Sequence, residues 1–122
     1  MNIRILFFSF LLMAFAFSAF AQDVGQGKFL SSLNDIPLMP GMTEVEDEAV
    51  VFDKASGRIG ESVAIAENLE PAEISRFYSL TLPQMGWLET QEGSFIRQDE
   101  RLSISIASAQ GQSLVRFMVT PR

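Results

Sequence analysis

The chain has 122 residues with nine basic and fifteen acidic side chains, a net charge of −6 at pH 7, and neither histidine nor cysteine. An acidic protein without a basic stripe repels phosphate, so binding to nucleic acid or to anionic lipid has little physical basis. The missing histidine and cysteine exclude Ser-His and Cys-His nucleophiles and remove the usual zinc ligands.

The first 21 residues have the pattern of a secretory signal peptide. One arginine lies within residues 1–4, residues 5–20 form an uncharged run of 16 residues, and Ala19 and Ala21 give the small-x-small cleavage site. An uncleaved anchor is the alternative, but a spanning helix needs roughly 20 apolar residues. We expect cleavage after Ala21, no membrane insertion of the mature protein, and a periplasmic or secreted location.

The mature chain of about 100 residues, with eight basic and fifteen acidic residues left, is long enough for one self-sufficient domain. Residues 22–35 are polar, contain two glycines and have only a weak apolar pattern, which predicts a flexible leader before a single domain at 36–122. The aromatic residues of the mature chain are of the usual number for the core of a small domain, and we expect them there: Phe29, Phe52, Phe77, Tyr78, Trp87, Phe95 and Phe117.

The domain is predicted to begin with an extended arm over residues 36–42. Pro37 and Pro40 restrict the residues before them to extended shapes, and Pro40-Gly41 suits the centre of a type II turn. A β-rich run at 49–53, turn residues at 54–57 and a second run at 58–66 then indicate a hairpin.

From Pro71 the apolar spacing changes to three and four residues, which predicts an α-helix. Pro71 fits its first turn and Gly86 the left-handed position beyond its end. Pro83 would remove a hydrogen bond, so the last turn is kinked or the regular helix stops near Leu82.

After Gly86 the apolar period returns to two, which predicts four strands at 87–90, 95–98, 101–106 and 114–120. The expected order is β-β-α-β-β-β-β. Ser103 and Ser105 alternate with apolar residues, so one sheet face is expected to meet solvent while the helix covers the other. The prediction is an α+β two-layer sandwich, with a mostly antiparallel sheet and one helix on one face.

Three segments resemble uncharacterised small exported bacterial domains: Ile36-Pro37-Leu38-Met39-Pro40-Gly41, then Phe77-Tyr78 leading to Leu82-Pro83-Gln84-Met85-Gly86-Trp87, then Phe95-Ile96-Arg97. The resemblance spans roughly residues 36–121. It implies the fold and export, and it brings no activity, ligand or site residue.

Two segments are candidate metal sites. Met39 and Met42 place two thioethers across a turn, and thioethers suit Cu(I), whereas filling gaps beneath the turn is the structural alternative. In an extended segment Glu44, Glu46 and Glu48 would share one side and could bind a hard cation such as calcium. A solvated acidic edge that discourages aggregation explains the same acids.

Three other pairs are candidates for chemistry. Lys54 and Ser56 are the only Ser-Lys candidates outside the leader, although a turn lysine is normally hydrated. Tyr78 and Trp87 form either a stacking surface or core anchors. Arg97 and Arg101, if on neighbouring strands, could hold a carboxylate or simply be solvated.

The leading hypothesis is therefore a non-enzymatic envelope module that binds a protein or another envelope component and has no cofactor, with the outward sheet face and the arm at 37–42 as contact surfaces. The alternative is a periplasmic metal-binding protein that uses Met39 and Met42 or the acids at 44–48. An enzyme that works with carboxylates alone is a third possibility, and it needs two acidic groups converging in a pocket.

Overall fold

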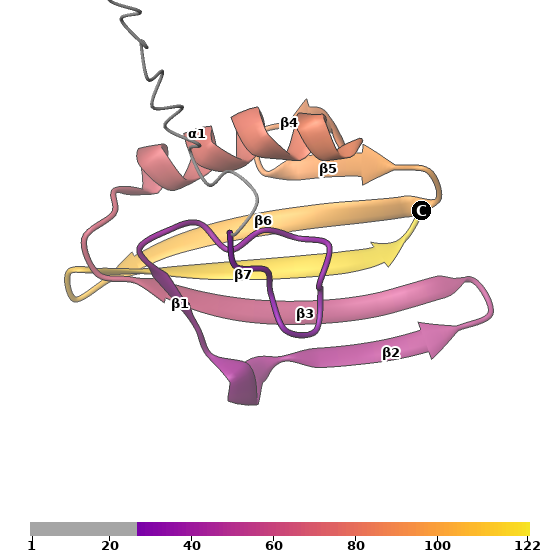
Figure 1. Cartoon of the computed structure of the whole chain (residues 1–122), viewed down its shortest axis with the longest axis horizontal. Coiled ribbons are helices and arrows are strands. Elements are labelled where there is room, and N and C mark those ends of the chain that lie inside the picture. Colours follow the sequence, from indigo (N-terminus) through magenta and orange to yellow (C-terminus); the bar gives the residue numbers. More distant parts are fainter. Residues whose placement is uncertain (1–26) are drawn as a thin grey trace, which may run out of the picture.

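The computed structural model describes residues 27–122, in which one helix packs on an antiparallel sheet of seven strands (Figure 1). The elements in chain order are β1 (Met42–Glu44), η1 (Glu46–Glu48), β2 (Val50–Lys54), β3 (Gly57–Ala66), α1 (Pro71–Thr81), η2 (Leu82–Met85), β4 (Leu88–Gln91), β5 (Ser94–Arg97), β6 (Glu100–Ala109) and β7 (Gln112–Pro121). The predicted α+β class and the place of the helix in the order are confirmed. The short strand β1 is an addition to the predicted order.

The strands run in the order β1-β3-β7-β6-β5-β4, and β2 also pairs with β3. Strand β3 is long enough to hold two partners along the same edge, because β1 pairs with residues 64–66 and β2 with residues 57–61. Strand β4 therefore ends the sheet on one side, and β1 and β2 end it on the other, one after the other along β3. Between β6 and β7, Gln110 and Gly111 both have positive φ, as a two-residue type I′ turn requires, and this turn sets a ten-residue register.

The helix ends where the sequence predicts. Pro71 occupies its first turn, and regular α-helix stops at Thr81, one residue before the predicted end. Pro83 lies in the following 3₁₀ segment η2, where its missing N–H removes no α-helical hydrogen bond, and Gly86 ends that segment with φ +90°. Ile74 and Tyr78 form the buried side of this helix, and Leu82 continues it at the start of η2.

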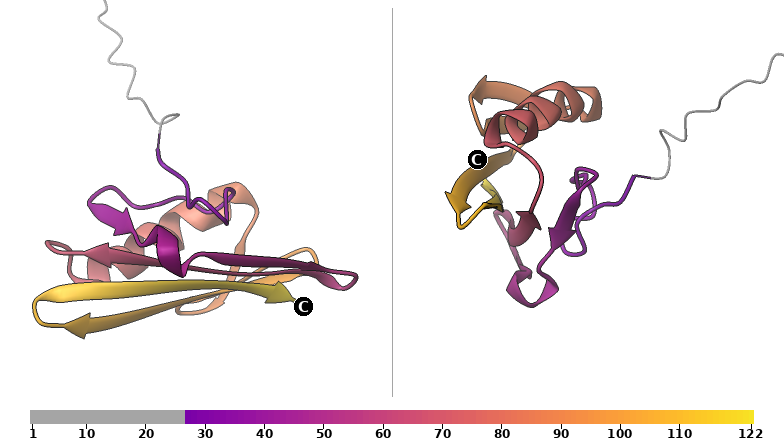
Figure 2. Two further views of the ribbon diagram at one scale, coloured as in Figure 1. Left: turned by 90° about the horizontal axis from the view of Figure 1, so that it is seen from below. Right: turned by 90° about the vertical axis from the view of Figure 1, so that its left-hand side faces the viewer.

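The sheet has one covered face, here named the inner face, and one open face, the outer face. Both α1 and the N-terminal segment lie on the inner face (Figure 2). The alternation of burial along β7 separates the two faces. Its inner residues are Ser113, Val115, Phe117 and Val119, and its outer residues are Leu114, Arg116 and Met118.

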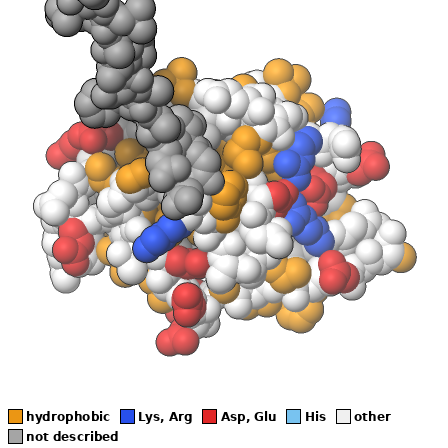
Figure 3. All heavy atoms as spheres, viewed as in Figure 1, with side chains coloured by type: hydrophobic (Ala, Val, Ile, Leu, Met, Phe, Trp, Pro, Cys, Tyr) orange, Lys and Arg blue, Asp and Glu red, His pale blue; other side chains and the backbone are white. Residues whose placement is uncertain are grey.

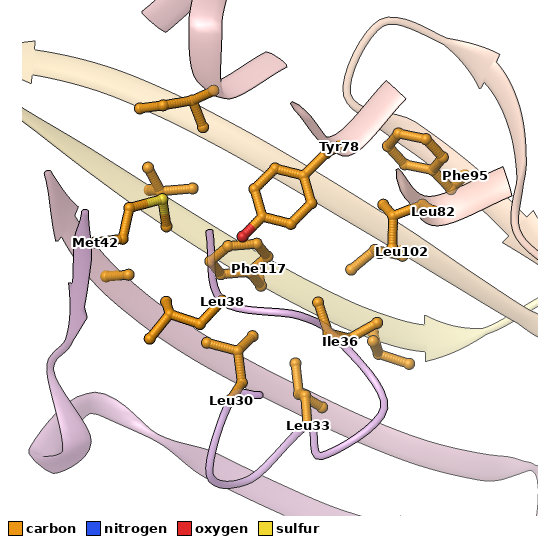
Figure 4. Close-up of a cluster of buried hydrophobic side chains, with 14 of the residues drawn as sticks. Leu30, Leu33, Ile36, Leu38, Met42, Tyr78, Leu82, Phe95, Leu102 and Phe117 are labelled. Carbon is orange, nitrogen blue, oxygen red and sulfur yellow. The ribbon is translucent and has the colours of Figure 1, made fainter. Parts of the chain in front are cut away.

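The N-terminal segment, residues 28–41, is part of the core. Leu30, Leu33 and Ile36 are fully buried in one cluster with the helix and the sheet (Figure 4). Its backbone is also bonded, since the amide of Leu30 donates to Ile36 O at 3.0 Å and that of Leu38 to Lys28 O at 2.8 Å. Of the predicted flexible leader, the described part is thus packed, and the folded domain begins before Ile36.

The arm at 36–42 is also fixed to the core, by Tyr78. The Tyr78 hydroxyl donates to Pro37 O at 2.8 Å and accepts from the Met39 amide at 3.2 Å. Because this hydroxyl is buried, desolvation raises the pKa of Tyr78. The predicted type II turn is present: the Met42 amide donates to Met39 O at 3.1 Å and Gly41 has φ +93°.

Two of the aromatic residues expected in the core lie at the surface instead, namely Phe29 and Phe52. The predicted signal peptide lies outside the described residues. Within residues 27–122, the helices are too short or too polar to cross a bilayer.

Candidate functional site

No other element of the described chain covers the outer face of the sheet (Figure 2), and the strand register identifies its residues. Residues directly opposite each other in an antiparallel ladder share a face. From Met118 on β7 the outer face continues to Glu61 on β3 and then to Val50 on β2. Phe52 lies on the same face, opposite Ile59.

The register extends the outer face to the opposite edge as well. Thr120 of β7 lies opposite Arg101 of β6. Arg101 in turn lies opposite Ile96 of β5, and Ile96 lies opposite Leu88 of β4. Leu88, at 64% exposure, therefore belongs to the same surface as Phe52, at 61% exposure, on the other edge.

Apolar side chains gather on this face. Among the described residues, eight large hydrophobic side chains are exposed, and the register places five of them here. They are Val50, Phe52, Leu88, Leu114 and Met118, which we name the outer apolar set. Soluble proteins expose single apolar residues routinely, so it is the gathering of several on one uncovered face that makes this face a candidate binding surface.

Polar groups lie between these apolar side chains. Arg116 forms an ion pair with Glu61 across β7 and β3. Ser105 is exposed and Ser103 half-buried, so the predicted contact of these serines with solvent holds fully for Ser105 and partly for Ser103. Val63 is buried on this face and is not part of the core cluster, which lies on the inner side. The outer face is thus mixed in chemistry, with apolar groups around a charged pair.

A second notable group is a charge cluster on the inner side that joins four segments. Arg58 donates to Asp35 at 2.8 and 3.0 Å and to Glu100 at 2.6 and 3.2 Å, and Arg97 also pairs with both carboxylates. On the side shown in Figure 3, basic and acidic side chains meet in one group. The two arginines and two acids balance, so the cluster connects the N-terminal segment to β3, β5 and β6 rather than attracting a charged ligand.

The pKa values in this cluster follow from its contacts. Partial burial raises the pKa of Asp35, but the hydrogen bonds from Arg58 and Arg97 outweigh that effect, and the pKa lies below its ordinary value. Hydrogen bonds to Asp35 and Glu100 raise the pKa of Arg58. Both shifts favour the charged forms.

Asp35→Asn is expected to make the free energy of unfolding depend less on pH in the acidic range. A carboxyl whose pKa is lower in the folded state contributes stability above its unfolded pKa of about 3.9, and that stability is lost as pH falls through the folded pKa. Urea unfolding between neutral pH and pH of about 3 should therefore show a steeper loss for the wild type than for the variant. Asp53→Asn, on the exposed strand β2, is the control, and equal slopes for wild type and Asp35→Asn would contradict the prediction.

The predicted acidic site is divided between two elements. Glu44 lies in β1, where it accepts hydrogen bonds from the Ser31 amide and hydroxyl and from the buried Ser62 hydroxyl at 2.8 Å. Glu46 and Glu48 lie in η1 and are exposed, so the extended row of three carboxylates predicted from the sequence is wrong. Among residues 27–122, no three acidic side chains are grouped closely enough to hold a metal ion.

The methionine pair is placed under its turn. Met42 is 7% exposed and belongs to the core cluster, and Met39 packs against that cluster. Met42, Glu44 and Glu46 do line one surface hollow of about 400 Å³, together with Lys28 and Phe29. Met39 and Glu48 do not line this hollow. The hollow therefore contains one methionine of the predicted copper site and two of the three acids of the predicted calcium site.

The structure separates the other candidate pairs or buries them. Tyr78 and Trp87 are each 1% exposed, so they are core anchors and offer no ring face to a ligand. The Arg97 guanidinium lies 4.2 Å from the Trp87 ring centre, on the inner side, whereas Arg101 points to the outer face. The two arginines are on neighbouring strands but on opposite faces.

The groups considered for catalysis lie in open surroundings. Lys54 and Ser56 are both exposed at the β2–β3 turn, where water surrounds a lysine. Glu67 and Glu70 both line a hollow of about 470 Å³ between the loop after β3 and the β6–β7 turn. Both side chains are exposed, so this hollow brings two carboxylates to one rim without enclosing them.

Comparisons with known proteins identify no relative of this chain. No family model, curated protein or solved structure matches the chain. The resemblance to small exported bacterial domains therefore stays a prediction, and the function is inferred from the surface of the described residues.

Proposed function

We propose that this protein is an exported, non-enzymatic binding module that takes a protein partner of the cell envelope on the outer face of its sheet. The observation that carries the proposal is the outer apolar set, five exposed hydrophobic side chains that the register places on one uncovered face. Protein interfaces combine such apolar contacts with a polar surround, and the Arg116–Glu61 pair supplies charge here.

The chemistry of this face favours a protein over other classes of partner. The mature chain carries eight basic against fifteen acidic residues, so phosphate-rich partners are repelled over most of its surface. An open sheet face with separate apolar side chains suits another protein surface, whereas small molecules bind in concave and enclosed sites. The arm at 37–42 is removed from the proposed contact surfaces, because Tyr78 fixes it and only Pro40 and Gly41 of its residues are exposed.

A pull-down with the tagged mature chain, residues 22–122, from envelope extract of its own source tests the proposal. The double variant Leu88→Gln/Met118→Gln changes two members of the outer apolar set, and Leu80→Gln is the matched control. Leu80 is 59% exposed on the helix, so it equals Leu88 in chemistry and nearly in exposure but lies on the other side of the sheet.

We expect wild type and Leu80→Gln to recover the same protein and the double variant to lose it at least about tenfold, since buried apolar anchors carry most of the binding energy of an interface. Recovery that is equal for all three proteins, or absent for the wild type, would reject the outer face as the binding surface. Matching circular dichroism spectra would establish that the variants fold.

A further inference from the structure

Strand β2 is an edge strand with an unusual surface. It pairs with β3 on one side only, at the edge of the sheet (Figure 1). All five of its residues are exposed. Edge strands present unpaired N–H and C=O groups, and proteins commonly blunt them with proline, bulges or inward-pointing charges. Here the strand carries Val50, Val51 and Phe52 in succession, with no proline and no bulge in its ladder with β3, and its charged residues Asp53 and Lys54 are confined to its end. Such an edge is suited to pair with another strand.

The residues around β2 are complementary to a second copy of themselves. In an antiparallel pair centred on Val51, the side chain of Val51 meets its own copy and Val50 meets Phe52 of the other chain. In the same register Glu48, which ends η1 just before the strand, comes to the end of the pair where Lys54 of the other chain lies. The two-fold axis passes between the two Val51 residues and repeats the other contacts, which gives three apolar pairs and two approaches of opposite charge.

From this complementarity we propose that two copies of this chain associate through β2, antiparallel and in register about Val51, to form one continuous sheet. Moving the centre to Phe52 would place Val50 opposite Lys54 and Val51 opposite Asp53, which pairs apolar with charged side chains, so the chemistry selects the Val51 register. Lys54 makes no ion pair among the described residues, and Glu48 makes none either, so both are available to the second copy.

The faces of the strand agree with this arrangement. Val50 and Phe52 lie on the outer face, so their cross-chain pairs would join the outer apolar sets of the two copies. Val51 lies on the inner face above Gly60, and a Cβ at Gly60 would touch both Val51 and Leu33. The Val51 pair would therefore extend the inner apolar layer. The inference goes beyond the proposed function, because it concerns the purified chain without any other protein.

Cysteine crosslinking tests the register directly, since the natural chain has no cysteine. In the proposed dimer Val51→Cys faces its own copy at the short Cα separation of opposite strand residues, within the range that a disulfide needs. Asp53→Cys is the control, because its two copies would be four residues apart along the strands, about 13 Å at 3.3 Å per residue. We expect mild oxidation to crosslink Val51→Cys and to leave Asp53→Cys monomeric on a denaturing gel.

Charge reversal tests the same register without a covalent bond. In sedimentation equilibrium the mature wild-type chain is expected to show a dimer, and Glu48→Lys and Lys54→Glu are each expected to raise the dissociation constant by about tenfold, since each change puts two like-charged pairs in the interface. The double variant Glu48→Lys/Lys54→Glu restores opposite charges and should restore the wild-type constant. These side chains are exposed, so the fold is unaffected.

A wild type that stays monomeric at the highest concentration reached would overturn the inference. A dimer in which Val51→Cys does not crosslink, or in which the double variant is no tighter than the single variants, would overturn it too, because another surface or register would then be responsible. None of these results depends on the pull-down. Failure of self-association and failure of partner binding at Leu88 and Met118 are therefore distinguishable.

Discussion

Leu33→Ala is expected to lower the free energy of unfolding by about 2–5 kcal/mol, the usual range for a leucine removed from a packed core. The Leu33 side chain is 0% exposed and lies against Gly60 of β3, where an added Cβ would come within 2.5 Å of Leu33 Cδ2. Glycine at position 60 thus makes room for this leucine, and alanine at position 33 would leave a cavity above the sheet. Since small domains have only about 5–15 kcal/mol of stability, the loss is a large share.

The Leu33→Ala experiment decides whether residues 28–35 are a packed layer or a leader. Thermal unfolding of the mature chain should show a midpoint roughly 10 °C or more below that of the wild type. Asn34→Ala is the control, because Asn34 is the exposed neighbour in the same segment and should change the midpoint little. If both variants unfold like the wild type, Leu33 is not part of the core.

Gly93→Ala is expected to destabilise the protein by about 3 kcal/mol, through two effects that add. Gly93 has φ +79°, a conformation that costs an L-residue about 1–2 kcal/mol. A Cβ at this position would also lie 2.7 Å from the backbone oxygen of Ile104. That oxygen belongs to strand β6, so a side-chain rotation cannot relieve the contact.

The backbone of Gly93 also holds the β4–β5 hairpin to β6 through a hydrogen bond. The Ile104 amide donates to Gly93 O at 2.8 Å, and a shift of the backbone at Gly93 would weaken this bond. Gly111→Ala is a matched control, because Gly111 has φ +76° but no atom lies within 4 Å of the position that a Cβ would take there. Urea unfolding should show a larger loss for Gly93→Ala than for Gly111→Ala, and equal losses would mean that φ alone is responsible.

The candidate surface was only partly predictable from the sequence. The alternation of Leu102, Ile104 and Ile106 with polar residues correctly predicts a solvated outer face. The sequence could not show that Phe52 and Leu88 lie on that face at opposite edges. Both are large apolar residues of the kind normally assigned to the core, and only the register of the intervening strands decides which side they occupy.

The sequence by itself determined the local elements of this protein. The change of apolar period at Pro71 and again after Gly86 specifies one helix and the strands that follow it, and the turn at Pro40-Gly41 follows from the φ angles these residues favour. These features depend on neighbours a few residues apart, so the sequence pattern carries them.

Only the tertiary structure decided what covers the sheet and what stays open. Leu30 and Leu33 look like a weak apolar pattern in a polar segment, yet they are buried because β3 provides Gly60 opposite them and the Tyr78 hydroxyl fixes the arm that follows. Asp35 is held by Arg58 and Arg97, which lie 23 and 62 residues further along the chain. Burial and ion pairing here depend on contacts between distant segments, and no local sequence pattern encodes those contacts.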